Sequence, residues 1–236
     1  MPEAKILTGV PGLDELLGGG FPQKATVLLE APPGTGKTSF CRQFAKEGMD
    51  KGQRCIYVAT SEPVEQIING LKAVGIEDLS NIYFIDGYSW RISGDVPEPP
   101  KNVVRLASLT ELNELTRLLK KEISGLETGS RIVLDSLSDM LLYAEPSSVF
   151  KFLQLFVGLV KGSNVAAVVV LEEGLHEPRF VATVSYICDG TIYFKLDGNM
   201  RSICVKRMLN TLHPLKWVPF TLSQHGVQIK VADFFA

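Results

Sequence analysis

The chain contains 236 residues, 45% of them hydrophobic and 21% charged, which is typical of a globular protein and argues against a disordered or fibrous chain. Its formal net charge of -2 gives no broad basic surface, so nucleic acid could bind through a local basic loop but is not favoured. The apolar runs are too short to span a bilayer, and the first residues are not a charged leader before an apolar segment. We therefore expect a cytoplasmic protein with no membrane span. From the length of the chain we expect a single domain over residues 1–236.

The first half of the chain alternates short apolar runs with amphipathic segments. The apolar runs lack helical spacing and predict strands at residues 25–30, 55–59 and 82–85. Amphipathic spacing predicts helices after residue 37 and at residues 64–74. This order is typical of parallel strands joined by helical connections. Residues 87–108 are rich in proline and lack periodicity, so they predict a long, flexible loop.

The second half begins with the same alternation and then changes. Ser108 and Glu111 have the spacing of a capping box and predict the start of a helix over residues 109–124. Apolar runs then predict a buried strand, a helix and a second buried strand, at residues 131–134, 148–161 and 165–171. Short runs after residue 180 predict antiparallel strands at residues 184–187, 190–196, 201–207, 217–222 and 226–230. The pattern predicts an α/β fold with a mostly parallel twisted sheet flanked by helices and antiparallel strands added at its C-terminal edge.

A glycine-rich loop, APPGTGKT, joins the first predicted strand to the first predicted helix. Its glycines allow backbone N–H groups to converge on a phosphate, and the helix N-terminus adds a positive dipole. Lys37 is expected to contact the β- and γ-phosphates, and the Thr38 hydroxyl to bind Mg²⁺. The alternative is a turn that only connects strand to helix, but the order Gly-Lys-Thr between these elements favours nucleotide binding. The expected nucleotide-binding residues are Pro33, Gly34, Thr35, Gly36, Lys37, Thr38 and Ser39.

A magnesium site of this kind also needs an aspartate at the end of a buried strand. Asp135 directly follows the apolar run at residues 131–134 and meets this requirement. A buried carboxylate is destabilising unless it is paired. A metal ion at the carboxyl end of the parallel strand would supply that pairing for Asp135. The alternative is an aspartate that caps the next turn through its side chain. We expect Thr38 and Asp135 to hold Mg²⁺ together.

Two further segments resemble those of a known family. The run TGVPGLDELLGGGFP at residues 8–22 stands before the glycine-rich loop, and VLDSLS follows at residues 133–138. With the loop, they resemble the KaiC-like branch of the RecA superfamily of P-loop NTPases, over residues 8–231. The resemblance implies a RecA-like core, ATP as the ligand and a homo-oligomer, in a ring or filament with ATP between subunits. Taken alone, GLDELLGGG predicts one turn of amphipathic helix that faces inward with Leu13, Leu16 and Leu17.

The resemblance also shows where this chain departs from the family pattern. In the family, the strand after the first helix ends in two glutamates, the first of which prepares the attacking water; here Ser61 and Glu62 stand in those positions. Serine cannot accept a proton as a carboxylate does, so Glu62 is the expected base if it reaches the water, and otherwise an acid in the first turn of the next helix. The family also supplies charge in trans from a KMR-type signature, where this chain has Arg207 at the lysine position and Leu209 at the arginine position. Arg207, or Lys206 if the alignment slips by one residue, is expected to replace that charge in part. The alternative for Arg207 is a solvated charge on an edge strand. The expected catalytic residues are Glu62, Lys37 and Arg207.

These features predict a protein that binds Mg-ATP, hydrolyses it slowly and acts as a nucleotide-dependent assembly or regulatory switch with an unidentified protein partner. The apolar helix at residues 148–161 is expected to suit a subunit interface as well as a core. The alternative function is that of a DNA-binding recombinase paralogue, although the loops at residues 143–148 and 172–180 are more acidic than basic. Glu172 and Glu173, in the second loop, stand where a γ-phosphate sensor or a solvated loop is expected. A third class, phosphate transfer to a protein, has no local signal.

Overall fold

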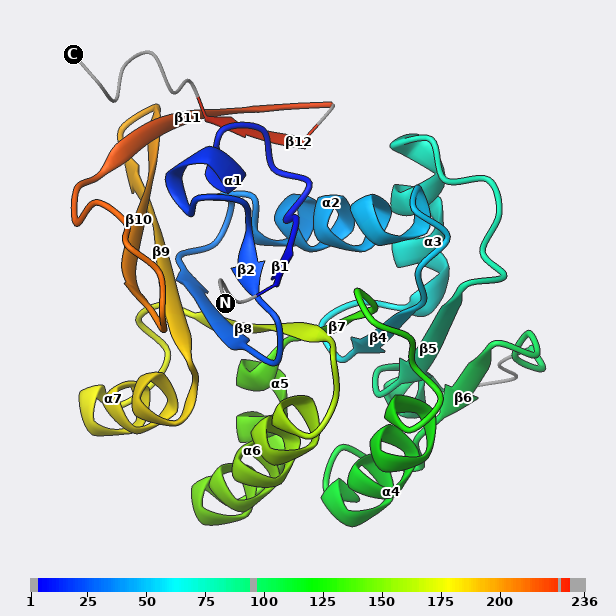
Figure 1. The fold of residues 1–236 in the computed structure, drawn as a ribbon. Helices are drawn as coiled ribbons and strands as arrows, with labels where there is room; N and C mark the ends of the chain where they lie inside the picture. The colour runs from blue at the N-terminus through cyan, green and yellow to red at the C-terminus, as the bar shows by residue number, and fades with distance from the viewer. Residues whose placement is uncertain (1–3, 94–96, 225, 230–236) are drawn as a thin grey trace.

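Uninterrupted apolar runs form the interior of a ten-stranded sheet in the computed structural model, which describes residues 4–93, 97–224 and 226–229 (Figure 1). The strand β8 (Ala166–Glu172) is buried along nearly its whole length, as expected for a parallel strand between two layers of helices. In spatial order the strands are β12 (Gly226–Ile229), β11 (Val218–Ser223), β10 (Met200–Met208), β9 (Gly190–Asp197), β3 (Thr26–Ala31), β8, β7 (Arg131–Asp135), β4 (Cys55–Ala59), β5 (Ile82–Asp86) and β6 (Val103–Arg105).

The sheet is parallel from β9 through β3 to β6 and antiparallel from β9 to β12. The predicted fold class, with antiparallel strands at the C-terminal edge, is therefore confirmed. Pairing places β3 between β9 and β8, and β7 between β8 and β4. Because parallel strands end at the same edge of a sheet, the segments that follow β3, β4, β7 and β8 lie near one another.

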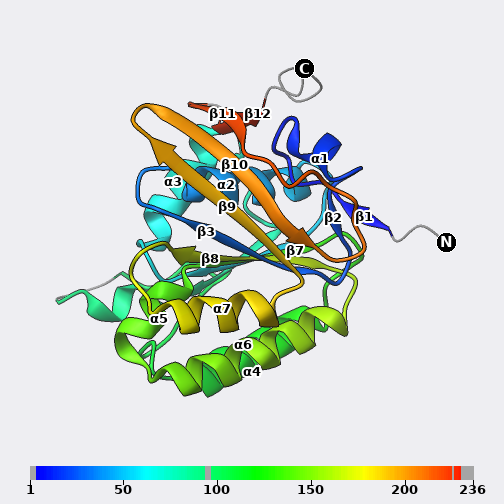
Figure 2. The ribbon, with the colours of Figure 1, turned by 90° about the vertical axis from the view of Figure 1, so that its left-hand side faces the viewer.

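Helices cover both faces of this sheet and enclose two apolar cores (Figure 1 and Figure 2). On one face lie α1 (Leu13–Leu16), α2 (Lys37–Met49) and α3 (Val64–Ala73). On the other face lie α4 (Leu112–Ile123), α5 (Leu137–Tyr143), α6 (Pro146–Lys161) and α7 (Pro178–Ile187). The strand β12 lies against α2, where the Gln43 side chain donates to the Val227 carbonyl at 2.9 Å and accepts from its N–H at 2.7 Å.

The apolar composition of α6 is explained by its place between α4 and α7. Phe152, Leu153 and Phe156 are buried, and Phe150 stacks on Phe180 of α7 with ring centroids 4.6 Å apart. The core therefore accounts for these side chains without a subunit interface. No helix in the described part of the chain, α6 included, is long and apolar enough to cross a lipid bilayer.

The segment before the glycine-rich loop forms a small structure of its own. Strands β1 (Lys5–Ile6) and β2 (Phe21–Pro22), which the sequence patterns did not predict, pair antiparallel. Between them, α1 is the predicted turn of helix, and its inward-facing residues Leu13, Leu16 and Leu17 are all buried. The confirmed turn packs on the same core as α2.

The prediction of a strand at residues 184–187 is wrong, because these residues form the last turn of α7. Pro178 occupies the first turn of that helix, where a missing N–H leaves no hydrogen bond unmade. Phe180 and Val184, four residues apart, are buried, while Tyr186 is 84% exposed. Helical spacing therefore outweighs the short apolar run, which is too short to distinguish a strand from a helix.

Residues 87–108 contain more regular structure than predicted. A turn of 3₁₀ helix, η1 (Ser89–Arg91), follows β5, and β6 pairs in parallel with β5 at the sheet edge. The predicted capping box is not formed, because Ser108 Oγ accepts a hydrogen bond from the N–H of Thr110 at 3.1 Å and no side chain caps α4. Residues 94–96 of the predicted loop lie outside the described residues.

Candidate nucleotide-binding site

The glycine-rich loop begins where β3 ends and closes at the first turn of α2. Gly34 and Gly36 have φ angles of 73° and 108°, a left-handed backbone that favours glycine. Gly36 is the N-terminal cap of α2, so the helix begins directly at Lys37. The Thr35 hydroxyl donates a hydrogen bond to the carbonyl of Pro32 at 2.7 Å. This is the type of backbone curl, at a helix N-terminus, that binds phosphate.

A cavity of about 360 Å³ lies beside this loop, at the carboxyl ends of β3, β4, β7 and β8. It is lined by Pro33, Lys37, Thr38, Ser61, Asp135, Ser136, Ser138, Asp139, Leu142, Val170, Glu172 and Leu175. The predicted site residues that it brings together are Pro33, Lys37, Thr38 and Asp135. The predicted residues in or next to the loop that do not line it are Gly34, Thr35, Gly36 and Ser39. We call this space the loop cavity.

Lys37 makes several polar contacts beside the loop cavity. Its Nζ donates to the carbonyl oxygens of Ala31 and Pro32 at 3.1 and 2.9 Å and pairs with the Glu172 carboxylate at 2.9 Å. Glu172 ends β8, and its backbone N–H donates to Ser138 Oγ at 2.8 Å. All the partners of this ammonium are acceptors, so a phosphate oxygen can replace one of them.

Asp135 ends β7 and is only 3% exposed. Its Oδ2 accepts a hydrogen bond from the Tyr57 hydroxyl at 3.0 Å. Burial raises the pKa of the Asp135 carboxyl to about 6; the Tyr57 hydroxyl and Lys37 oppose the rise, and Glu62 and Asp139 add to it. A divalent cation beside Asp135 would favour the charged carboxylate, so this environment suits a metal ion.

The predicted magnesium ligands, Thr38 and Asp135, both line the loop cavity. Across the described residues, no group of three or more His, Cys, Asp or Glu side chains could hold a metal ion. Proteins usually hold Mg²⁺ through one or two carboxylates together with water and substrate phosphates. The hydroxyl of Thr38 and the carboxylate of Asp135 therefore fit a magnesium ion that binds together with a nucleotide.

Ser61 and Glu62 follow β4 but have different surroundings. Ser61 lines the loop cavity, and its hydroxyl donates a 3.4 Å hydrogen bond to the carbonyl of Asp135. Glu62 Oε1 pairs at 3.1 Å with Nη2 of Arg42 in α2, and Glu62 is not among the residues that line the cavity. The end of β4 therefore presents a hydroxyl to the cavity, where the family pattern has a carboxylate.

Asp139 also lines the loop cavity, although it is absent from the predicted site. It lies in α5, a seven-residue helix that is too short for a clear periodic signal. Its Oδ2 accepts a hydrogen bond from Ser136 Oγ at 2.8 Å, and its Oδ1 lies 3.4 Å from Nη1 of Arg91. The available signal was the Ser-x-x-Asp spacing directly after Asp135, which is typical of a helix N-terminus.

Arg207 lies on β10 and does not line the loop cavity. It lines a second cavity of about 780 Å³ together with Glu30 and Glu173. Its Nη2 donates to the carbonyl oxygens of Ser185 and Cys188 at the end of α7. Within one chain, Arg207 therefore stabilises the C-terminal end of that helix.

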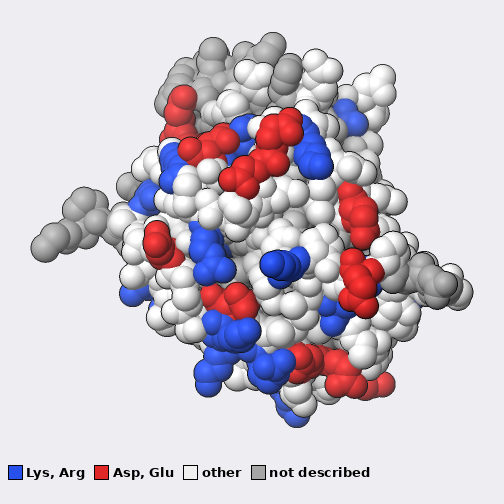
Figure 3. Space-filling model, turned by 90° about the vertical axis from the view of Figure 1, so that its right-hand side faces the viewer, with Lys and Arg blue, Asp and Glu red and all other residues white. Residues whose placement is uncertain are grey.

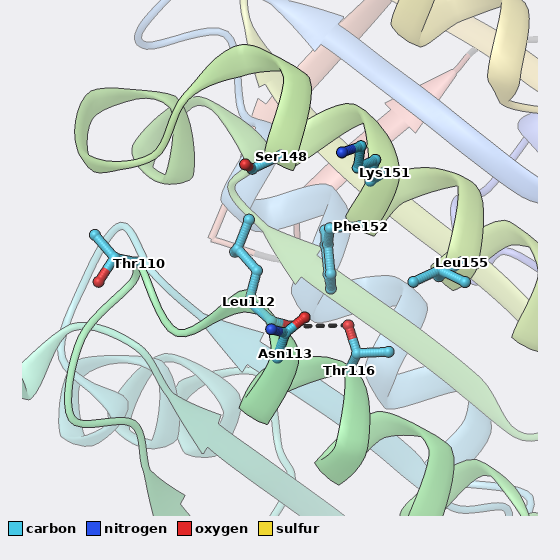
Figure 4. A pocket seen from close by; sticks show the side chains of 8 residues that line it. All are labelled: Thr110, Leu112, Asn113, Thr116, Ser148, Lys151, Phe152 and Leu155. Carbon is cyan, nitrogen blue, oxygen red and sulfur yellow. Dashed lines mark hydrogen bonds between the residues drawn. The ribbon is translucent and has the colours of Figure 1, made fainter.

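A third cavity, of about 170 Å³, lies between α4 and α6 and contains none of the predicted site residues (Figure 4). Lys151 is the only charged residue among those that line it. The Thr116 hydroxyl drawn in Figure 4 is already bonded to the carbonyl of Leu112 at 2.7 Å. This space therefore offers little chemistry beyond packing.

The fold and the loop cavity together define a class of protein. A parallel sheet with a glycine-rich phosphate loop after β3 and a buried aspartate at the end of β7 is typical of P-loop nucleotide-binding proteins. The model of the KaiC ATPase family matches residues 6–233, and the chain belongs to this family of the RecA superfamily. The resemblance noted at residues 8–22 and 133–138 is confirmed by this match.

Known relatives and structures agree with this assignment. A UPF0273 protein of Thermotoga maritima is 32% identical to this chain, over 95% of each protein. A UPF0273 protein of Methanocaldococcus jannaschii is 31% identical, over 94% of this chain and 95% of its own length. The crystal structure of the KaiC-like protein PH0186 from Pyrococcus horikoshii matches with a TM-score of 0.78 and 22% identity, over 97% of this chain and 100% of its own. The structural match confirms the predicted RecA-like fold.

Proposed function

We propose that the protein binds Mg-ATP in the loop cavity. The observation that supports this most directly is that Lys37 and Thr38 at the start of α2 and Asp135 at the end of β7, almost a hundred residues apart in the chain, line one cavity. Lys37 would exchange Glu172 for the β- and γ-phosphates, and Thr38 and Asp135 would hold the magnesium ion. Bound magnesium supplies positive charge that offsets the charge of the phosphates. Membership of the KaiC ATPase family supports ATP as the nucleotide.

The proposed hydrolysis is slow, so the protein acts as a nucleotide-dependent switch. Ser61 cannot assist the attacking water as a carboxylate does, and such assistance contributes roughly 10² to 10⁴ in rate. Leu209 stands where the family signature has an arginine, and an arginine finger contributes about 10³ to 10⁵. Glu62 is a candidate to replace part of the missing base, and Arg207 part of the missing positive charge. In this structure Glu62 pairs with Arg42, and Arg207 donates to a carbonyl oxygen at the end of α7.

Binding of a fluorescent ATP analogue, together with phosphate release from Mg-ATP, tests both parts of this proposal. Lys37→Ala removes the phosphate contact and should weaken ATP binding at least about tenfold. Lys46→Ala is the matched control, because Lys46 lies in the same helix but pairs with Asp50 on the surface at 2.6 Å. If Lys37→Ala, Lys46→Ala and the intact protein bound ATP with equal affinity, the proposed binding site would be contradicted. Turnover far above about one per minute would contradict the switch.

We further propose a homo-oligomer with ATP between subunits, which binds a protein partner in its ATP state. The connection between β10 and β11, residues 209–217, exposes Leu212 and Leu215 to 98% and 73%. Leu209 and Trp217, in the same connection, are also about half exposed. A short connection with four exposed apolar side chains is a candidate surface for docking on another protein. Arg207 lies in β10 just before this connection, so docking of the connection on a neighbour would bring Arg207 toward that neighbour.

DNA binding of the recombinase type is not favoured by the charges around the loop cavity. The segments at residues 143–148 and 172–180 contain four glutamates, one arginine (Arg179) and no lysine. Figure 3 shows acidic and basic side chains interspersed over the face that carries α3 and α4. Binding of single-stranded DNA that weakens steeply with salt would reverse this ranking.

A further inference from the structure

The end of β4 presents no proton acceptor to the loop cavity, and this raises the question of which group activates water. This inference rests on the proposed hydrolysis of ATP. Ser61 lines the cavity with a hydroxyl, and Glu62 is held by Arg42. A base must come within hydrogen-bond reach of the attacking water, directly or through another water. The acids that line the cavity are therefore the first candidates.

Three acids line the loop cavity: Asp135, Glu172 and Asp139. Asp135 is 3% exposed, accepts a hydrogen bond from Tyr57 and is the proposed magnesium ligand. Glu172 pairs with Lys37 at 2.9 Å. Asp139 has neither role. Its side chain is 19% exposed, about as much as that of Glu172, and its contact with Arg91, at 3.4 Å, is longer than the pair of Glu172 with Lys37. It is therefore the accessible cavity acid that neither the phosphate-binding lysine nor the magnesium ion would occupy.

Hydrogen bonds hold Asp139 beside the end of β4. Its Oδ2 accepts a hydrogen bond from Ser136 Oγ at 2.8 Å. The backbone of Ser136 is in turn hydrogen-bonded to the Thr60 side chain. Thr60 Oγ1 donates to the Ser136 carbonyl at 2.7 Å and accepts from the Ser136 N–H at 2.5 Å. Thr60 is the residue before Ser61, so these bonds fix the start of α5 against the position where the family pattern has its glutamate.

Arg91 fixes the same carboxylate from the other side. Its Nη1 lies 3.4 Å from Asp139 Oδ1, and its Nη2 donates to the carbonyl of Thr60 at 3.1 Å. The guanidinium also lies over the ring of Tyr143, 4.8 Å from its centroid. Arg91 therefore ties β4 and α5 together and limits the orientations of Asp139.

We propose that Asp139 is the general base for the slow ATP hydrolysis of this protein, replacing in part the carboxylate that Ser61 lacks. The water oxygen forms a bond to the γ-phosphorus as the bond between that phosphorus and the oxygen of ADP breaks. One proton of the water passes to the Asp139 carboxylate and then to solvent. Arg91 is a positioning residue that orients Asp139.

The test is single-turnover phosphate release by Asp139→Asn, with ATP-analogue affinity and thermal stability measured on the same samples. Asparagine keeps the size of the side chain and can still accept from Ser136, but it cannot take up the proton. Turnover should fall at least about tenfold while ATP affinity stays within about twofold. Glu65→Gln is the control for loss of a negative charge as such, because Glu65 is exposed in α3 and does not line the loop cavity.

Rescue separates a chemical role from a structural one. Ser61→Glu combined with Asp139→Asn should restore turnover, because it returns a carboxylate to the same wall of the cavity. A fall in ATP affinity parallel to turnover, no rescue, or loss of turnover in Glu62→Gln but not in Asp139→Asn would overturn the assignment. ATP binding with no measurable turnover in the intact protein would also overturn it, yet leave the proposed ATP site intact. Failure of the intact protein to bind ATP would instead contradict the proposed function.

Discussion

Glu30 lies near the end of β3 with 7% of its surface exposed, and its Oε2 has no hydrogen-bond partner among the residues that the structure describes. Burial raises the pKa of its carboxyl, Glu173 adds to the rise, and a hydrogen bond from Tyr193 opposes it. An acid whose pKa is higher in the folded state holds its proton more tightly when folded. The stability that this proton contributes is present at low pH and is lost as the pH rises from the unfolded pKa through the folded pKa.

Glu30→Gln should therefore flatten this part of the pH dependence, because glutamine does not ionise. As the pH rises above about 4, the ordinary pKa of a glutamate, the melting temperature of the intact protein should fall relative to that of the variant. Thermal unfolding across this range measures the difference, with Glu65→Gln as the exposed control. Parallel curves for the intact protein and Glu30→Gln would show that the buried carboxyl is not responsible.

At the scale of elements, the packing of α2 on β7 depends on one buried guanidinium. Arg131, 1% exposed, donates to the Phe44 carbonyl at 2.7 Å and to Gln53 Oε1 at 2.8 Å. It reaches these partners across Gly48 of α2, where an added Cβ would lie 2.3 Å from Arg131 Nε. Gly48 therefore leaves room for the Arg131 side chain, which is held in place by its hydrogen bonds to Phe44 and Gln53.

Alanine at Gly48 should destabilise the protein by about 1–3 kcal/mol, because the clash outweighs the usual gain from replacing glycine in a helix. Gly158 in α6 is the matched control, since an added Cβ there meets nothing within 4 Å. Gly158→Ala should stabilise by about 0.5–1 kcal/mol. Chemical unfolding of both variants gives the two free energies, and a stabilising Gly48→Ala would contradict the packing argument.

The whole molecule buries its apolar residues in two cores, one on each face of the sheet, and the connection between β10 and β11 belongs to neither. Leu212 and Leu215 are exposed there, while Leu155 on α6 is 56% exposed beside the core of the opposite face. In the proposed homo-oligomer, a neighbouring subunit would cover Leu212 and Leu215. Oligomer formation through this connection is therefore a property of the whole molecule that substitution can test.

Light scattering with Mg-ATP and with Mg-ADP should show a larger mass for the intact protein in ATP. The double variant Leu212→Ser and Leu215→Ser should lose most of that increase, because it removes apolar area that the interface would bury. Leu155→Ser should retain the increase. The proposal fails if ATP does not change the mass of the intact protein, or if the double variant assembles as well as Leu155→Ser.

Local patterns of residues were sufficient to predict the central strands and the glycine-rich loop. The apolar runs at residues 25–30 and 131–134 had to be buried on both faces, whichever strands they paired with, so their patterns predicted β3 and β7. Gly36 and Lys37 act through local backbone geometry and therefore needed no knowledge of distant contacts. Asp135 was predictable because it directly follows its strand.

The charged groups that meet at the loop cavity could not be predicted in this way, because the packing of the folded chain brings them together. Asp139 reaches it because Ser136 is bonded to Thr60, while Glu62, although next to Ser61 in the chain, pairs with Arg42. Residues 184–187 are a second example. Their short apolar run fits a strand or a helix equally well, and it is the burial of Val184 in the core that favours the helix. These outcomes depend on contacts between segments far apart in the chain, and the periodicity of a short window contains no information about them.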